Sequence, residues 1–339
     1  MFNLKVTDYD KQVYEKELKS FLPDEIVDVH IHPYKSEFEP FGIREGVSKW
    51  PARVADEMTF EQMSECFEKL FPEKKVIPVA CGDAFKNIDQ SNDYLRDEAQ
   101  KHGFPILYRT SFDMDVDELE KNVKAGGFLG LKPYLSNYPA YLPSKEIRIF
   151  DFLPHEHLEI ADKNGWAVLL HIPRDGRLKD AVNLGQLMEI EEKYPNVKLI
   201  VAHVGRAYSK QDIGDAFDIL GKTKNMYFDF AANLSDDAIR ACIEAVGTKR
   251  LMFGADLPIA IMRMYRITEN GVYYNVVPRG LYGDLTGEAH MRETDESDIT
   301  LMIYEQIRAM KRVAEELNLS KEDIYDIFAG NAKRLLGIK

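Results

Sequence analysis

The sequence predicts an α/β fold for residues 1–339: a single domain built as a (β/α)8 barrel, in which eight parallel strands are each followed by a helix. Three observations indicate this fold. Short apolar runs alternate with longer amphipathic stretches along the whole chain, the runs are too apolar to leave one strand face in water, and 339 residues suit one barrel. The expected strands are residues 26–32, 75–80, 105–112, 128–132, 167–171, 197–203, 226–230 and 250–256.

The first expected strand argues against the main alternative, a doubly wound open sheet. Such a sheet normally carries a glycine-rich phosphate turn after its first strand. Here the chain continues as HIHPYKSEFEP over residues 30–40, which contains no glycine. We therefore favour the barrel.

Helical periodicity marks the segments between the strands. In residues 58–71, the apolar side chains from Phe60 to Leu70 recur at spacings of three and four, as on one face of a helix. Residues 178–194 show a similar pattern. The first twenty residues predict an extra amphipathic helix that precedes the barrel.

Two connecting segments are longer than a minimal barrel needs. Residues 33–56 carry Trp50, and the insertion of residues 257–297 after the eighth strand mixes tyrosine with arginine. Loops longer than about 15 residues in compact domains tend to cover functional sites. We expect covers or subunit contacts here. A contact between copies in a homo-oligomer would fall on the insertion or on the N-terminal helix.

Composition indicates which partners and which cellular compartment to expect. The formal charge of −13, from 44 basic and 57 acidic residues, disfavours a nucleic acid as the main partner. Three cysteines without CxxC spacing suit a reducing compartment. Charges near the N-terminus and the lack of a long apolar run predict no signal peptide and no membrane span. We expect a cytoplasmic protein that acts on a small molecule.

Five polar side chains lie at the C-terminal ends of expected strands: His30 and His32 on the first, His171 on the fifth, His203 on the sixth and Asp256 on the eighth. In a barrel, these ends converge on the face where active sites are built. Imidazoles and a carboxylate gathered in one place suit a first-row divalent metal, and Zn²⁺ is the expected ion, with Mn²⁺ as the alternative.

Alternation along the first strand supports the metal site. His30 and His32 are two residues apart and are expected to point to the same side as Asp28, whereas Val29 and Ile31 should point into the helical layer. One histidine at a strand end is more often a hydrogen-bonded core residue than a ligand. The five residues together favour a metal site.

Short motifs add a resemblance to a known family. DVHIHPY, LLHIP, AHVGR and FGADLP occur in this order, and DIFAGNAKRLLGI follows at residues 326–338. Together they resemble the amidohydrolase superfamily, in its amidohydrolase-related (family 2) branch, over residues 26–338. The resemblance implies a metal-dependent barrel enzyme. Most members are hydrolases, and a minority are non-oxidative decarboxylases.

The resemblance also implies residue roles. His30, His32 and His171 would be metal ligands. His203 would be either a ligand to a second metal or a catalytic acid that polarises the substrate. Asp256 would bind the metal and transfer protons as the general base and then the general acid.

Lys132, in GFLGLKPY, leaves the number of metals open. Members with two metals often carry a carboxylated, bridging lysine at the end of strand four, whereas a bare lysine in this branch commonly accompanies one metal. Lysine could also anchor an anionic substrate. We favour one metal.

Several other residues are candidates for substrate binding or for the rim of the pocket. Arg174, Arg206 and Arg279 could pair with a substrate carboxylate in a fork, or could be ordinary surface arginines. His155 and His157 are expected at a helix start or at the pocket rim. Cys81, His102 and His290 are expected to have no chemical role.

The predicted function is metal-dependent hydrolysis of an amide, lactone or ester bond in a small, anionic substrate. One alternative is decarboxylation of an aromatic or unsaturated acid. Decarboxylase members tend to place glycine and an acidic residue after the strand-six histidine, whereas Val204, Gly205 and Arg206 stand here. Another alternative is a non-catalytic binding module, although all five expected ligand positions are filled.

Overall fold

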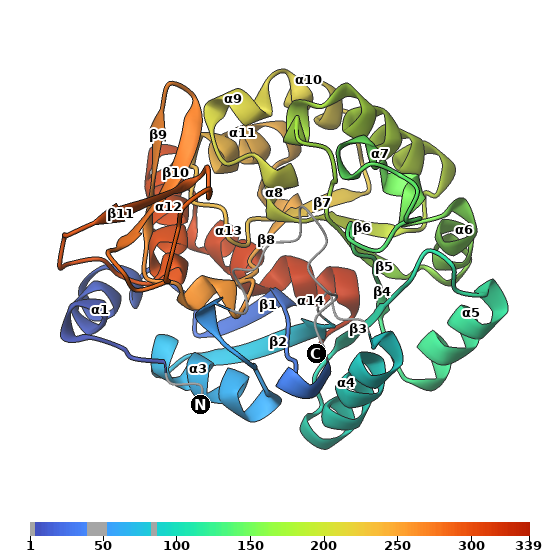
Figure 1. The fold of residues 1–339 in the computed structure, drawn as a ribbon, viewed down its shortest axis with the longest axis horizontal. Coiled ribbons are helices and arrows are strands. Elements are labelled where there is room, and N and C mark those ends of the chain that lie inside the picture. Colours follow the sequence, from blue (N-terminus) through green and yellow to red (C-terminus); the bar gives the residue numbers. More distant parts are fainter. Residues whose placement is uncertain (1–3, 39–52, 83–86) are drawn as a thin grey trace.

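Eight parallel strands surround the centre of the molecule, and strands that are neighbours in the sequence are neighbours in the sheet (Figure 1). The computed structural model describes residues 4–38, 53–82 and 87–339. This architecture confirms the predicted (β/α)8 barrel. The strands are β1 Glu25–Ile31, β2 Lys75–Cys81, β3 Ile106–Arg109, β4 Gly130–Lys132, β5 Ala167–Leu170, β6 Lys198–Val201, β7 Met226–Asp229 and β8 Leu251–Met252.

The barrel closes between β1 and the segment that follows β8. The backbone N–H of Val29 donates to the carbonyl oxygen of Phe253 at 3.1 Å, and that of Asp256 donates to the carbonyl oxygen of His30 at 2.7 Å. The chain therefore continues to pair with β1 beyond the end of β8. This extension brings the predicted aspartate beside the predicted histidines.

Helices cover the outside of the barrel (Figure 1). Thr59 and Gln62 form a capping box that begins α3, and Gly103 in the left-handed region ends α4. The α-helices are α1 Asp8–Val13, α3 Phe60–Leu70, α4 Ile88–His102, α5 Val116–Ala125, α6 His155–Asn164, α7 Ala181–Lys193, α8 His203–Arg206, α9 Lys210–Ile213, α10 Ala216–Leu220, α11 Asp236–Val246, α12 Met302–Glu316, α13 Lys321–Tyr325 and α14 Asn331–Leu336. Two π-helical turns cover Tyr14–Leu18 and Asp326–Gly330, and 3₁₀ turns cover Ser36–Phe38, Ser144–Glu146, Ile149–Asp151, Arg177–Lys179, Thr248–Arg250 and Ile259–Ile261.

Apolar side chains alternate between two layers, because parallel strands in a barrel are buried on both faces. On β5, Ala167 and Leu169 pack in one cluster with residues of the other strands. Val168 and Leu170 pack in a second cluster that includes Leu187 of α7. The first cluster fills the barrel, and the second joins the barrel to its helices.

A β-bulge breaks this alternation in β1, the strand in which one prediction is wrong. Asp28 pairs with Pro78 and Ile31 pairs with Ala80, so β1 holds one extra residue relative to β2 in this interval. Val29 packs with Val27 in the cluster inside the barrel and not in the helical layer, so the prediction for Val29 is wrong. Ile31 packs in the outer cluster as predicted.

Helix α14 closes the barrel at the end opposite the histidines. Asn331 Nδ2 donates to the carbonyl oxygen of Leu251, where β8 begins, at 2.8 Å. Lys333 forms an ion pair with Glu25, where β1 begins. Leu336 of the same helix is part of the cluster that fills the barrel.

The long segment after β8 contains a small sheet, which the sequence analysis did not predict. β9 Tyr265–Glu269 and β10 Val272–Pro278 form an antiparallel hairpin, and β11 Met291–Thr294 pairs with β10 in parallel. The hairpin turn is Asn270–Gly271, and both residues have positive φ. Of the long segment 33–56, residues 39–52 with Trp50 lie outside the described residues.

The predicted N-terminal helix is present and joins the insertion to the barrel. Asp10 of α1 is fully buried. Its carboxylate accepts hydrogen bonds from Arg263 Nη2 at 2.8 Å and from Thr300 Oγ1 at 2.7 Å. Burial alone would raise the pKa of Asp10, but these bonds and those from Thr7 hold it below its usual value of 3.8.

No helix among residues 4–38, 53–82 and 87–339 combines the length and the apolar character that crossing a bilayer requires.

We expect Asp10→Asn to lower the free energy of unfolding by about 3 kcal/mol, because Arg263 would lose its buried charged partner. Urea denaturation followed by circular dichroism measures this change. Asp8→Asn is the matched control, since Asp8 lies on the same helix and its side chain is 93% exposed.

The Asp10 contribution should also depend on pH. A carboxyl group whose pKa is lower in the folded protein stabilises it above the unfolded-state pKa, and this stabilisation is lost as the pH falls through the folded-state pKa. The difference between wild type and Asp10→Asn should therefore shrink in acid, below about pH 4. An equal difference at pH 7 and pH 3 would contradict the role of this ion pair.

Candidate metal centre

The five side chains predicted as ligands lie together at the C-terminal ends of the strands. Asp256 Oδ1 is 3.3 Å from His32 Nε2 and 3.8 Å from His30 Nε2. His171 Nε2 is 2.8 Å from His203 Nε2. His30 belongs to both groups, because it offers a ligand atom within 4.8 Å of those of His32 and Asp256, and also of those of His171 and His203.

These distances test whether the residues fit a metal ion. Two nitrogen or oxygen ligands at about 2.05 Å from one tetrahedral ion are roughly 3.3 Å apart. The His32–Asp256 distance of 3.3 Å matches this spacing. The His171–His203 distance of 2.8 Å is shorter and is that of a hydrogen bond. His30, His32 and Asp256 therefore fit a divalent ion as they stand, and His171 belongs to the neighbouring group with His30 and His203.

The end of β8 reaches the histidines through an unusual local conformation. A Cβ atom on Gly254 would lie 2.8 Å from His30 Cβ, so only glycine allows this close approach. Asp256 itself has a φ of 64°, in the left-handed region that a non-glycine residue rarely adopts. The strained backbone therefore belongs to the residue whose carboxylate faces His32.

The turn after β6 is similarly strained. His203, Val204 and Arg206 all have positive φ. The turn is held by hydrogen bonds from the backbone N–H of His203 to Asp229 Oδ1 at 2.8 Å and from His203 Nδ1 to the carbonyl oxygen of Ala231 at 2.7 Å. His203 Nε2 is thereby left facing His171.

Lys132 contacts two of the candidate ligands. Its Nζ is 3.2 Å from His30 Nε2 and 3.1 Å from His171 Nδ1, and the side chain is fully buried. Burial, and then the charge of Lys132, hold the pKa values of His30 and His171 well below the usual value. Both imidazoles are therefore neutral, as metal ligation requires.

His32 has a different environment. Its Nδ1 lies 3.0 Å from the Tyr134 hydroxyl oxygen and 3.4 Å from Cys81 Sγ. Burial alone would lower the pKa of His32, but Cys81 and the hydrogen bond to Asp256 raise it well above the usual value. Burial alone would raise the pKa of Asp256, but the hydrogen bond with His32 and nearby positive charges lower it below its usual value. The hydrogen bond between the two residues therefore stabilises the charged form of each.

Asp28, which was predicted on the same side of β1 as the two histidines, forms hydrogen bonds to the backbone. Its Oδ1 accepts from the N–H of His30 at 3.1 Å and from that of Ala255 at 2.9 Å. Burial raises the pKa of Asp28 to about 8 despite these bonds. Asp28 therefore fixes the positions of β1 and the segment after β8 relative to each other.

The three predicted substrate-binding arginines lie in different places. Arg206 follows the strained turn, and its Nη1 donates to the carbonyl oxygens of Ile172 and Pro173 beside His171. Arg174 pairs with Asp180 and with Glu146 on the mouth loops. Arg279 lies in the inserted segment and pairs with Asp295 and Glu293. Of these arginines, Arg206 is the one held next to the histidines.

The sequence analysis missed several residues around the site. Asp229 ends β7, and its Oδ2 is 3.0 Å from His30 Nδ1. Tyr134 contacts His32, and the guanidinium carbon of Arg109 lies 5.3 Å from the centre of the Tyr134 ring. The histidines were identified as polar side chains at the C-terminal ends of expected strands. The same criterion would have identified Asp229, in MYFDF.

The inserted sheet also contacts the mouth of the barrel. The guanidinium carbon of Arg266, on β9, lies 4.7 Å from the Tyr208 ring centre and 5.0 Å from that of Tyr273. Arg266 Nη1 donates to the carbonyl oxygen of Ala232, just after β7, at 3.2 Å. The insertion is therefore packed against the loops that carry the site.

The remaining histidines lie elsewhere. His155 Nδ1 is 2.7 Å from the Tyr194 hydroxyl oxygen, and buried His157 bonds through Nε2 to the carbonyl oxygen of Met114. His102 pairs with Glu98 on α4. His290 stacks on Tyr273 in the insertion. None of these four belongs to the two ligand groups described above.

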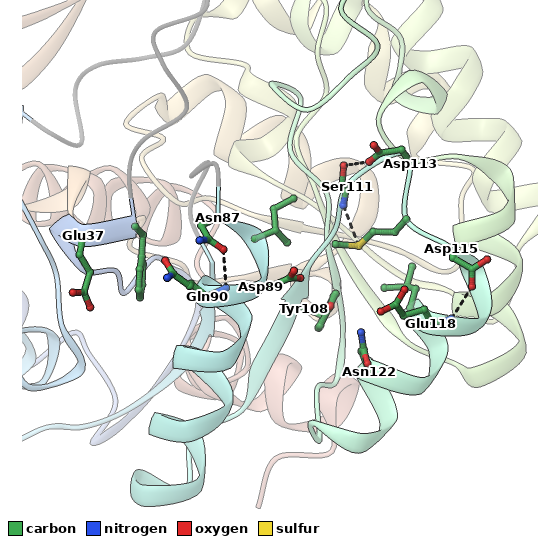
Figure 2. A pocket seen from close by; sticks show the side chains of 14 residues that line it. Glu37, Asn87, Asp89, Gln90, Tyr108, Ser111, Asp113, Asp115, Glu118 and Asn122 are labelled. Atoms are coloured by element: carbon green, nitrogen blue, oxygen red, sulfur yellow. Dashed lines mark hydrogen bonds between the residues drawn. The ribbon is translucent and has the colours of Figure 1, made fainter.

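A separate hollow of about 900 Å³ lies between α4 and α5 (Figure 2). Its lining is acidic and polar, and it includes Asp89, Asp113 and Glu118. None of the five candidate ligands lines it, so this hollow is not the site at the strand ends.

Comparisons with known proteins agree with this geometry. The model of the family described as "Amidohydrolase" matches residues 27–338. No curated protein matches the chain.

Many solved structures share its fold, including the following three. One is a probable 2-pyrone-4,6-dicarboxylic acid hydrolase from Acinetobacter baumannii with citric acid bound, at 16% identity, covering 92% of this chain and 99% of that one, with a TM-score of 0.57. Another is a dihydroxybenzoic acid decarboxylase from a Polaromonas species with manganese and 2-nitroresorcinol, at 14% identity, covering 93% and 98%, with a TM-score of 0.56. The third is an amidohydrolase from Burkholderia multivorans with zinc, at 12% identity, covering 93% and 99%, with a TM-score of 0.59.

The ligand set leads to a prediction about metal content. Protein purified without added metal should carry about one Zn²⁺ or Mn²⁺ per chain, and the double variant His30→Ala/His32→Ala should lose it, because two of the imidazole ligands are removed. Elemental analysis measures both. A content near two ions would instead favour Lys132 as a carboxylated bridging ligand.

His155→Ala/His157→Ala is the matched control, since these histidines have the same spacing but lie outside the ligand groups. Equal loss of metal from both double variants would contradict the proposed location of the site.

Proposed function

This chain belongs to the amidohydrolase family, and we propose that it is a metal-dependent hydrolase that cleaves an amide, lactone or ester bond of a small, anionic substrate. The observation that carries the proposal is the position of Asp256. Its carboxylate lies 3.3 Å from His32 Nε2 and 3.8 Å from His30 Nε2, so a proton acceptor is in place where ligands converge.

The residues that would hold the ion are His30, His32, His171 and Asp256. Two of the similar structures contain manganese or zinc, and the imidazole-rich ligand set favours zinc in this chain, with manganese as the alternative. When bound, such an ion supplies Lewis-acid activation of a water molecule and of the scissile carbonyl group.

Asp256 and His203 would carry the proton transfers and stabilise the charge. Asp256 accepts a proton from the attacking water and returns it to the leaving nitrogen or oxygen atom. His203 presents Nε2 to the same space, because its Nδ1 is bound to the carbonyl oxygen of Ala231. In the role of the catalytic acid, His203 would donate from Nε2 to the oxygen atom on which negative charge develops.

Fixed cations at the mouth support an anionic substrate. Arg206 uses Nη1 to bind two backbone carbonyl groups, which fixes its guanidinium beside His171. Lys132 adds a second positive charge between His30 and His171. Arg174 and Arg279 already pair with carboxylates of this chain, so Arg206 and Lys132 are the better candidates for a substrate carboxylate.

We expect Asp256→Asn to lower kcat by about 10²- to 10⁴-fold while much of the metal remains, because the amide cannot accept a proton from water. Turnover of a panel of amides, lactones and esters, with the metal content measured in parallel, tests this expectation. Full activity of the variant would rule out Asp256 as the base. Release of CO₂ from carboxylic acids, with no hydrolysis, would favour the decarboxylase alternative.

Asp175→Asn is the matched control for this experiment. Asp175 is an exposed carboxylate on the loop that follows β5, and it is not part of either ligand group. Its replacement should leave kcat within about a factor of two of wild type, as expected of surface substitutions.

We expect Arg206→Met to raise KM for anionic substrates by about 10- to 100-fold, because a charge-assisted hydrogen bond is worth about 1.5–3 kcal/mol. Neutral esters that react should show a much smaller change. Steady-state kinetics on matched charged and neutral substrates measures the difference, with Arg96→Met on the exposed face of α4 as the control. Equal effects on both substrate classes would contradict recognition of the anion by Arg206.

A further inference from the structure

The carboxylate of Asp229, at the end of β7, contacts two of the candidate metal residues. The side chain is fully buried. Its Oδ2 is 3.0 Å from His30 Nδ1, and its Oδ1 accepts hydrogen bonds from the backbone N–H groups of His203 at 2.8 Å and Ala231 at 3.0 Å. Asp229 therefore has partners on both oxygen atoms.

The partners of His30 determine which nitrogen carries its proton. A lysine ammonium group only donates hydrogen bonds, and Lys132 Nζ lies 3.2 Å from His30 Nε2. Nε2 must therefore present its lone pair. The proton is on Nδ1, from which it is donated to Asp229 Oδ2. This tautomer is the one that can bind a metal through Nε2.

The other oxygen atom of Asp229 holds the turn that carries His203. His203 has a φ of 58°, which is unfavourable for a residue with a side chain. Asp229 Oδ1 binds the backbone of both His203 and Ala231, and the carbonyl group of Ala231 in turn accepts from His203 Nδ1. His203 Nε2 consequently faces the site.

We propose that Asp229 is a positioning residue that fixes the His30 tautomer and the His203 turn, and that metal affinity depends on it. The inference rests on the metal-dependent function proposed above. Carboxylates that accept from the second ring nitrogen of a metal-binding histidine typically contribute a factor of about 10 to 100 in metal affinity.

Asp229→Asn tests the proposal with little change in shape. An amide nitrogen in place of Oδ2 would donate to His30 Nδ1 and move the ring proton to Nε2. An amide nitrogen in place of Oδ1 would face two backbone N–H groups. We therefore expect Zn²⁺ affinity to fall by about 10- to 100-fold. Competition with a chelating dye, in the absence of substrate, measures this affinity.

Gln306→Leu is the matched control for a purely structural role. Gln306 is fully buried and binds the backbone N–H of Ala232 at 3.0 Å and the carbonyl oxygen of Gly254 at 2.7 Å. It joins the segments that follow β7 and β8 without a hydrogen bond to a histidine. Its Zn²⁺ affinity should stay within about threefold of wild type. Equal loss of affinity in both variants, or no loss in Asp229→Asn, would overturn the proposal.

A second measurement does not depend on folding of the variant. In the wild-type protein loaded with Zn²⁺, long-range ¹⁵N–¹H correlation spectra should show the His30 proton on Nδ1. A proton on Nε2, or a wild-type protein that binds no Zn²⁺, would overturn the proposal. If affinity depends on Asp229 but no bond is hydrolysed in any substrate, the proposed function fails and the role of Asp229 stands.

Discussion

Burial of charge inside the barrel is the constraint on which the site depends. Lys132 and Asp229 are both fully buried, and a buried charge is tolerated only when it has hydrogen-bonding partners of the opposite or complementary kind. Here the partners are imidazoles and backbone N–H groups. Because each of these groups has a limited set of donors and acceptors, the contacts restrict where the histidine protons can be. The same contacts that satisfy the buried charges therefore prepare the metal ligands.

The strained residues at the site follow from the same constraint. Asp256 and His203 both adopt a positive φ, and each is held by several hydrogen bonds to neighbouring strands. Positive φ in residues with a side chain persists only where the surroundings enforce it. In this chain, β1, β7 and the segment after β8 provide that enforcement, so the strain lies where three elements meet.

The sequence alone predicted the barrel and the gathering of its five strand-end side chains, because apolar runs and the geometry of parallel strands determine both. The β-bulge, which places Ile31 in the outer layer although Val27 and Val29 lie inside the barrel, could not be predicted from the alternation of residues, since the extra residue in β1 is visible only against β2. Asp229 was missed although it ends a predicted strand. The hairpin β9–β10 was missed although Asn270–Gly271 is a strong turn signal. The sequence of its strands is polar and therefore typical of a loop.

The N-terminal helix obtains many of its native contacts late during synthesis of the protein. Tyr14 stacks on Tyr304, Asp10 binds Thr300, and Glu17 binds Arg308, which lie almost three hundred residues further along the chain. Since ribosomes synthesise the chain from the N-terminal side, residues 8–18 emerge long before the residues of α12 that they contact. Until α12 has emerged, the apolar face of the N-terminal helix lacks this part of its final packing and is exposed to other proteins in the cell.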